Sequence, residues 1–212
     1  MADRIGPVAA VRVAKGHKGP AERPFSVNSA NKMVCRKVTS VVRRIHLHFQ
    51  DYEQTAHHAK ALRDRIQLLA RIRSDVGEDI NQSLHHYAVA EAVGELRKMH
   101  KGIRIHHKDV HPEQTGGAND PDIKGHARGG KLVCAEVTAH LKPQGMVDTR
   151  IRKALEKLLQ MECDHRYYFV TTTVMKQRAD TKLRKMNCSM EVVLLDTGCD
   201  AIVEQEARKG SR

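Results

Sequence analysis

Aromatic residues are scarce in this chain. Tryptophan is absent, and Phe, Trp and Tyr together make up 3% of the 212 residues. The core must therefore be aliphatic, and the chain offers few rings for the base stacking by which proteins usually bind single strands or RNA. No apolar run approaches the roughly 20 residues of a membrane span, and no secretory-type apolar segment follows the N-terminus. We expect a soluble, cytoplasmic protein with no membrane partner.

The cysteines and histidines lack the spacing of metal or disulfide sites. Five cysteines form an odd set without any Cys-X-X-Cys pair, which is typical of reduced, mostly buried thiols. Fourteen histidines include the pairs His57-His58 and His85-His86. None has zinc spacing backed by a second ligand cluster, so we expect surface or nucleic-acid-facing histidines instead.

What the chain has in excess is positive charge. It carries 37 Lys and Arg against 25 Asp and Glu, a net charge of +12, which favours a polyanionic partner. Ten basic and only three acidic residues lie between positions 32 and 73. We expect Arg43, Arg44, Arg71 and Arg73 in this region to lie along the phosphate backbone of double-stranded DNA. The alternative is that these charges are the solvated faces of packing helices, which could also lie beside a dimer interface.

The first half of the chain is predicted to be helical after a Gly- and Pro-containing start. Residues 1–28 read as a mobile basic arm. Residues 29–76 read as a basic helical pair, with apolar residues at three- and four-residue steps over about 29–49 and 53–73. Gly77 is expected to break this pattern, and a third helix follows to about residue 100.

Residues 77–200 are predicted to form the main α/β unit. Alternation predicts a strand over residues 103–110, and residues 121–142 predict a β-hairpin that turns at Ala127–Gly130. A helix to about residue 163, a buried strand over 166–174, a basic connection that is either helix or loop, and a last strand over 190–196 follow. Residues 201–212 are expected to form a C-terminal tail.

The hairpin carries the chemistry that the sequence suggests. In the second arm, alternation places Glu136, Thr138 and His140 on one face, and Val133, Ala135, Val137 and Ala139 on the other. If the two arms pair, Asp122 can lie close to Glu136. Two converging carboxylates form a hard-oxygen site suited to Mg²⁺.

At these residues the sequence resembles the PD-(D/E)XK nuclease superfamily, which has the restriction-endonuclease-like fold. Pro121-Asp122 and Glu136-Val137-Thr138 match its motif, except that Thr138 stands where the family usually has Lys. The order of predicted elements from residue 78 also matches the αβββαβ core of that family. The resemblance therefore implies a mixed central sheet flanked by helices, preceded here by a basic helical extension.

The resemblance also implies metal-dependent hydrolysis of a DNA phosphodiester. Asp122 and Glu136 would bind Mg²⁺, for which Mn²⁺ can substitute, and the carbonyl of Val137 would complete the shell. Glu91 would be the auxiliary acid that some members place on the preceding helix. The positive charge that Thr138 cannot supply would come from Lys142, on the same strand, or from Lys153 or Arg150. Arg128 and Lys131, at the hairpin turn, are assigned to DNA contact.

The function predicted in this way is a Mg²⁺-dependent DNA endonuclease, of the type II restriction or a related host-defence class, acting as a homodimer. Two alternatives stay open: a repair or recombination nuclease of the same fold, such as a junction resolvase, and a DNA-binding protein without catalysis. Signatures of other enzymes are absent from the sequence, including a phosphate-binding Gly-X₄-Gly-Lys loop and a His-Glu-X-X-His helix.

Overall fold

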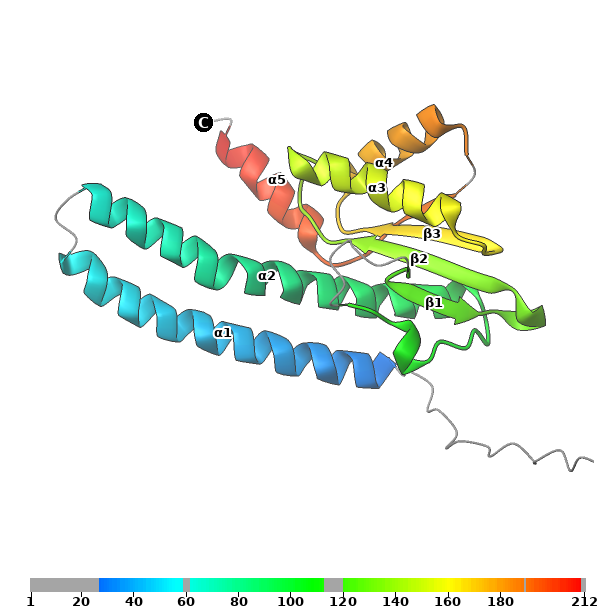
Figure 1. Ribbon diagram of the computed structural model, residues 1–212, viewed down its shortest axis with the longest axis horizontal. Helices are drawn as coiled ribbons and strands as arrows, with labels where there is room; N and C mark the ends of the chain where they lie inside the picture. The colour runs from blue at the N-terminus through cyan, green and yellow to red at the C-terminus, as the bar shows by residue number, and fades with distance from the viewer. Residues whose placement is uncertain (1–26, 59–61, 113–119, 189, 211–212) are drawn as a thin grey trace, which may run out of the picture.

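The computed structural model describes residues 27–58, 62–112, 120–188 and 190–210. It shows an α/β protein whose four-stranded mixed sheet is flanked by helices (Figure 1). A long helix covers one face of the sheet and two shorter helices cover the other. The predicted basic arm at the N-terminus lies outside the described residues, apart from its last two positions. No helix in the described part is both long and apolar enough to cross a membrane.

The N-terminal region forms two long helices where the sequence predicted three. They are α1 (Val27–His58) and α2 (Leu62–Met99), which run side by side as an antiparallel pair. Gly77 lies inside α2, so the predicted helix break at this residue is wrong. Glycine within a helix costs only about 1 kcal/mol, and α2 remains packed against α1 on both sides of it. Arg44 ion-pairs with Asp79 at 2.7 Å, and Tyr52 donates a hydrogen bond to Asp75 at 3.0 Å.

The sheet has the order β1-β2-β3-β4. Its strands are β1 (Ile123–His126), β2 (Leu132–Thr138), β3 (His165–Val170) and β4 (Glu191–Leu194). The first two form the predicted antiparallel hairpin, and β3 and β4 add in parallel. The hairpin turn is a short 3₁₀ segment, η2 (Arg128–Gly130), in which Gly129 and Gly130 both adopt φ of +77°. This left-handed conformation is accessible to glycine without strain.

The strand predicted over residues 103–110 is reduced to two isolated bridges. Arg104 pairs with His126, and Val110 pairs with Ile123. Between them the chain turns through a 3₁₀ segment, η1 (His107–Asp109), and the Asp109 carboxylate accepts a hydrogen bond from the backbone N–H of His106. That turn interrupts the ladder that a regular strand would need.

The second half of the chain supplies three helices, α3 (Met146–Gln160), α4 (Thr173–Met186) and α5 (Cys199–Gly210). The strand predicted over 166–174 ends early because Thr172 caps α4, its hydroxyl accepting from the N–H of Met175. The segment predicted as a C-terminal tail is helical through residue 210. Asp200 in its first turn holds it to the start of α4 by accepting from the N–H and the hydroxyl of Thr173 at 2.7 and 2.9 Å.

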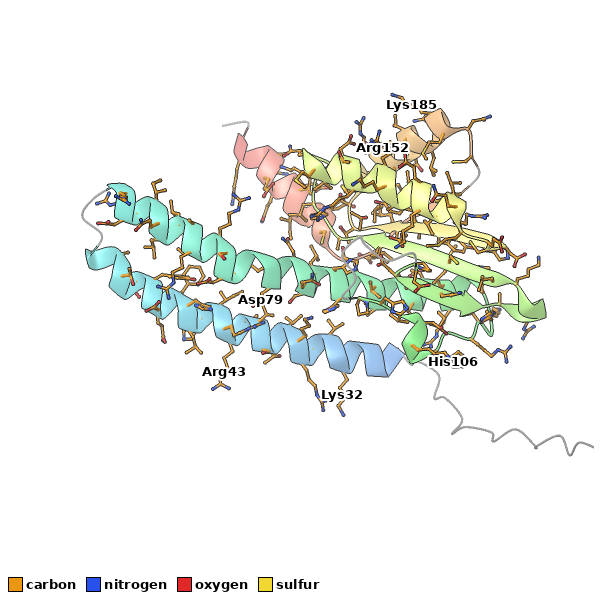
Figure 2. The ribbon with its side chains drawn as sticks, viewed as in Figure 1. Lys32, Arg43, Asp79, His106, Arg152 and Lys185 are labelled. Carbon is orange, nitrogen blue, oxygen red and sulfur yellow. The ribbon has the colours of Figure 1, made fainter. Side chains whose placement is uncertain are left out.

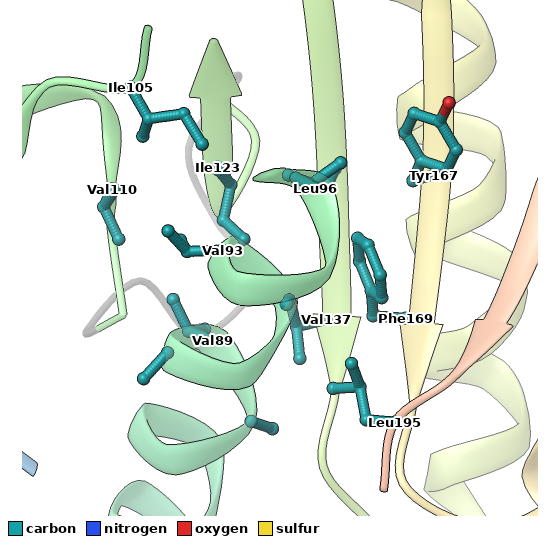
Figure 3. Packing of buried hydrophobic residues seen from close by; sticks show 14 of the residues in the cluster. Val89, Val93, Leu96, Ile105, Val110, Ile123, Val137, Tyr167, Phe169 and Leu195 are labelled. Carbon is teal, nitrogen blue, oxygen red and sulfur yellow. The ribbon is translucent and has the colours of Figure 1, made fainter. Parts of the chain in front are cut away.

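Two apolar clusters sandwich the sheet, as the predicted alternation along β2 requires. Val89, Val93 and Leu96 of α2 pack against Val137 and Phe169 on one face (Figure 3). On the other face, buried residues of α3 and α4 pack against Cys134, Tyr168 and Val170. Residues 134, 136 and 138 therefore share the face that α3 covers.

Candidate active site

Asp122 and Glu136 meet across the hairpin. Ile123 is opposite Ala135 in the antiparallel register of β1 and β2, so Asp122, which directly precedes β1, lies across from Glu136. Both side chains are buried, with 5% of Asp122 and 10% of Glu136 exposed. Asp122 Oδ2 accepts a hydrogen bond from the backbone N–H of Val137 at 2.8 Å, which fixes the carboxylate over β2.

The environment disfavours negative charge on both acids. Burial raises the pKa of Asp122, and the neighbouring charge of Glu136 raises it further. Burial likewise raises the pKa of Glu136, while Lys157 opposes that shift. Two buried carboxylates that repel one another gain stability from a proton or from a bound cation. The pair therefore has the electrostatics of a cation site.

Lys157 is the cation that contacts this pair. It lies on α3, its side chain is 22% exposed, and its Nζ is 2.7 Å from Glu136 Oε1. From the sequence, Lys142, Lys153 or Arg150 was expected to supply this charge, and Lys157, one helical turn after Lys153, was not. The available signal was the position of Lys157 between the inward residues Leu155 and Leu158, which puts it at the edge of the face that packs on the sheet.

Thr138 is oriented by a tyrosine on the neighbouring strand. The hydroxyl of Tyr168 donates to Thr138 Oγ1 at 2.8 Å, and Tyr168 pairs with Glu136 in the parallel register. Burial raises the pKa of Tyr168, so this phenol stays protonated. Thr138 contributes a fixed polar group next to the acids, and no charge.

The site also contains two histidines that sequence reasoning did not assign to it. His85 of α2 places Nε2 3.9 Å from Asp122 Oδ1, and burial lowers its pKa to about 4, helped by His86 and His140. His140 follows β2, and its pKa is lowered by burial and by Arg150, whose guanidinium lies 3.5 Å from the His140 ring. His85 is therefore neutral at pH 7, with its ring facing the acidic pair.

Two other residues predicted for the site, Glu91 and Lys142, interact with groups other than the acidic pair. Glu91 on α2 raises the pKa of Tyr87 and of Lys98, and it is not among the groups that shift the pKa of Asp122 or Glu136. Lys142 is not on the strand, because β2 ends at Thr138. Its Nζ ion-pairs with Glu206 of α5 at 2.7 Å.

The donor set fits a hard cation that needs few protein ligands. In the described ranges no three His, Cys, Asp or Glu side chains are grouped to hold a metal ion, so Asp122 and Glu136 would be the two carboxylate ligands. Mg²⁺ is commonly held by one or two carboxylates, with water and substrate phosphate completing its octahedral shell. The participation of the Val137 carbonyl stays a prediction.

The basic residues predicted to contact DNA are divided among different environments. Arg44 is paired with Asp79, and Arg71 with Asp51 and Asp75 at 3.2 and 3.5 Å. Arg43 and Arg73 are exposed. Arg128 and Lys131 are also exposed, but they flank the hairpin turn, and Lys131 is five residues before Glu136, roughly 16 Å along the strand.

Positive charge is also concentrated on the helices that cover the face of the sheet carrying Glu136. Helices α3 and α4 together contain nine Lys and Arg against three Asp and Glu. Arg152, Arg184 and Lys185 are exposed there, and Figure 2 shows Arg152 and Lys185 on the outer side of this layer. The carboxylate pair thus lies under a positively charged surface.

Comparison with known proteins identifies no relative. No family model, no curated protein and no solved structure matches the chain.

Proposed function

We propose that this protein is a Mg²⁺-dependent DNA endonuclease with a restriction-endonuclease-like core. The observation that carries the proposal is the buried pair of Asp122, one residue before β1, and Glu136 on β2, with Lys157 2.7 Å from Glu136. Two acids and a lysine at one point of a sheet form the set that the motif predicts, with the lysine supplied by a helix. Thr138 occupies the position where the family usually has that lysine.

The element order supports the same fold. From α2 onward the chain runs through the bridged segment 104–110, β1, β2, α3 and β3. This is the αβββαβ order with its first strand reduced to two bridges. In this proposal α1 and the first half of α2 form the N-terminal extension.

The residues of the site divide the work of phosphodiester hydrolysis. Mg²⁺, when bound, would polarise the scissile phosphate and lower the pKa of an attacking water molecule. Asp122 and Glu136 hold the cation, and the N–H of Val137 keeps the Asp122 carboxylate in place. Lys157 offers positive charge beside Glu136, where negative charge develops in the transition state.

Duplex DNA is the substrate that fits the charged surface around the carboxylate pair. The α3–α4 surface is positively charged next to the carboxylates, and its side chains can neutralise phosphates on either side of the scissile bond. The chain is poor in the aromatic rings that single-strand binding uses. A type II restriction or host-defence role is consistent with a compact enzyme that acts on duplexes.

Cleavage of supercoiled plasmid with Mg²⁺ or Mn²⁺ tests the proposal. We expect wild-type protein to cut, and Asp122→Asn and Glu136→Gln to lose at least 100-fold in rate while still binding DNA. Asp120→Asn is the matched control, because Asp120 is exposed and two residues from Asp122. Full activity in either site variant, or no cutting by wild type on any DNA, would overturn the proposal.

The pattern of cutting distinguishes the classes of nuclease. Discrete fragments from a long duplex indicate restriction-type specificity. Cutting confined to four-way junctions indicates a resolvase. Salt-dependent binding that never nicks DNA indicates a DNA-binding protein without catalysis.

A further inference from the structure

Helix α1 has an apolar flank that nothing in the described chain covers. It is the outermost layer of the molecule, with α2 between it and the sheet (Figure 1). Eight of the twelve large hydrophobic residues that are exposed in the described part lie on α1 and α2. On α1, Val42 is 59% exposed, Phe49 is 55% exposed and Val38 is 37% exposed. Contiguous apolar exposure of this kind marks an interaction surface.

The residues of this flank follow a pattern of their own. The a/d spacing of a coiled-coil seam, four, three and four residues, relates Val38, Val42, Ile45 and Phe49. Ile45 is half-buried, and the other three are exposed. The buried residues Val34, Val41 and Tyr52 occupy the adjacent flank, and Tyr52 reaches Asp75 of α2. Helix α1 therefore has two neighbouring apolar stripes, and α2 satisfies one of them.

We infer that the open stripe of α1 pairs with the same stripe of a second copy of this chain, in antiparallel orientation. The stripe is self-complementary when reversed. Val38 of one copy then lies opposite Phe49 of the other, and Val42 lies opposite Ile45. Each of these two contacts places a smaller side chain against a larger one. The two-fold axis passes between Arg43 and Arg44.

The charges beside the stripe select the antiparallel arrangement. Lys32 and Glu53 are three heptads apart and lie on the same side of the stripe, and both are exposed. In an antiparallel pair, equivalent flanking positions of the two helices meet. Lys32 of each copy would then face Glu53 of the other, which gives two opposite-charge pairs at the ends of the interface. Figure 2 shows Lys32 projecting from the side of α1 away from α2.

This association is independent of the nuclease proposal. The stripe and the carboxylate pair are separated by α2, whose His85 lies 3.9 Å from Asp122, so the interface covers neither Asp122 nor the α3–α4 surface. A protein without catalytic activity would still dimerise by this route, and a monomeric variant would still hold both acids in place.

Sedimentation equilibrium of the full chain tests the interface. We expect wild type to have twice the 23.9 kDa mass of one chain, and Val42→Glu with Phe49→Glu to have the monomer mass with unchanged helix content by circular dichroism. Leu47→Glu is the matched control, because Leu47 is 56% exposed on the same helix but outside the stripe. A monomeric wild type, or a double variant that remains dimeric, would overturn the inference.

Crosslinking tests the orientation. In a Cys35→Ser background, Val38→Cys with Phe49→Cys should form a disulfide-linked dimer under mild oxidation, and Val38→Cys alone should not. Lys32→Glu and Glu53→Lys should each weaken the dimer several-fold, and the two together should restore it. Efficient crosslinking through Val38→Cys alone would show a parallel pair and would overturn the antiparallel assignment.

Discussion

The ammonium of Lys157 lies 2.7 Å from Glu136 Oε1, joining α3 to the middle strand pair of the sheet. Both side chains are largely buried, at 22% and 10% exposure, so loss of one partner leaves a buried charge unpaired and costs more than loss of a surface ion pair. Lys157 offsets the negative charge of the acids, and the contact makes its position depend on the packing of the whole of α3. Changes at Lys157 should therefore affect both catalysis and stability, and the effect on stability should depend on pH.

Lys157→Met is predicted to reduce the rate of DNA cleavage by about 100- to 1,000-fold, the usual effect of removing one transition-state stabilising group. It should also lower the free energy of unfolding by about 2 kcal/mol at pH 8, because Glu136 is left as an unpaired buried carboxylate. The loss should be smaller at pH 5, where Glu136 can take up a proton.

Two further variants make this prediction specific. Lys98→Met removes an exposed Lys–Glu pair, that of Lys98 and Glu95, and should change neither property by more than a few tenths of a kcal/mol or a factor of two. Adding Glu136→Gln to Lys157→Met should restore stability without restoring cleavage. Urea unfolding at the two pH values supplies the measurement, and a pH-independent loss would contradict the electrostatic explanation.

Metal binding should be visible without any DNA. At a Mg²⁺ concentration tenfold above the dissociation constant, binding stabilises the fold by about 1.4 kcal/mol, which raises the melting temperature of a chain of this size by about 4 °C. Asp122→Asn and Glu136→Gln should abolish the shift, and Asp120→Asn should keep it. Equal shifts in all four proteins would mean that Mg²⁺ binds elsewhere.

Acid should destabilise the fold through His85. Burial lowers its folded-state pKa to about 4, against about 6.5 for an unfolded histidine. Above pH 6.5 neither state binds the proton, so His85 then adds nothing to the pH dependence. As the pH falls from 6.5 to 4, the unfolded chain is protonated first and the folded state loses up to about 3 kcal/mol.

The comparison of wild type with His85→Gln isolates this effect. Protonation of Asp122 and Glu136 acts in the opposite direction, because their pKa values are raised, and it is present in both proteins. His86 and His140 also face His85 and remain unchanged. The difference in unfolding free energy should therefore shift in favour of the variant below pH 6.5, and parallel pH profiles would refute the assignment.

Salt dependence should locate the DNA-contacting surface. Replacing Arg152, Arg184 and Lys185 together by Gln should reduce the slope of log affinity against log salt by about 3, if each neutralises one phosphate. Replacing Arg43 and Arg73 on the helical pair should leave the slope unchanged. The slopes are measured as binding of a duplex at several salt concentrations, with all variants in an Asp122→Asn background. The reverse result would show that the helical pair contacts the DNA.

The sequence predicted the parts of the molecule that local patterns determine. Alternation along β2 assigned Val137 and Glu136 to opposite faces, and the Gly pair at 129–130 located the turn, because both depend on a few neighbouring residues. The continuity of α2 through Gly77 depends on packing against α1, which no local pattern contains. Lys157 and His85 reach the acids from two different helices, so their roles follow from tertiary packing.

The outer position of α1 has a consequence for how DNA would be cut. If two copies join back to back through this helix, their carboxylate pairs open toward opposite sides of the assembly. A short stretch of duplex could then occupy just one of them at a time. Supercoiled plasmid would accumulate as nicked circles before linear molecules arise, and the two strand breaks would follow as separate events.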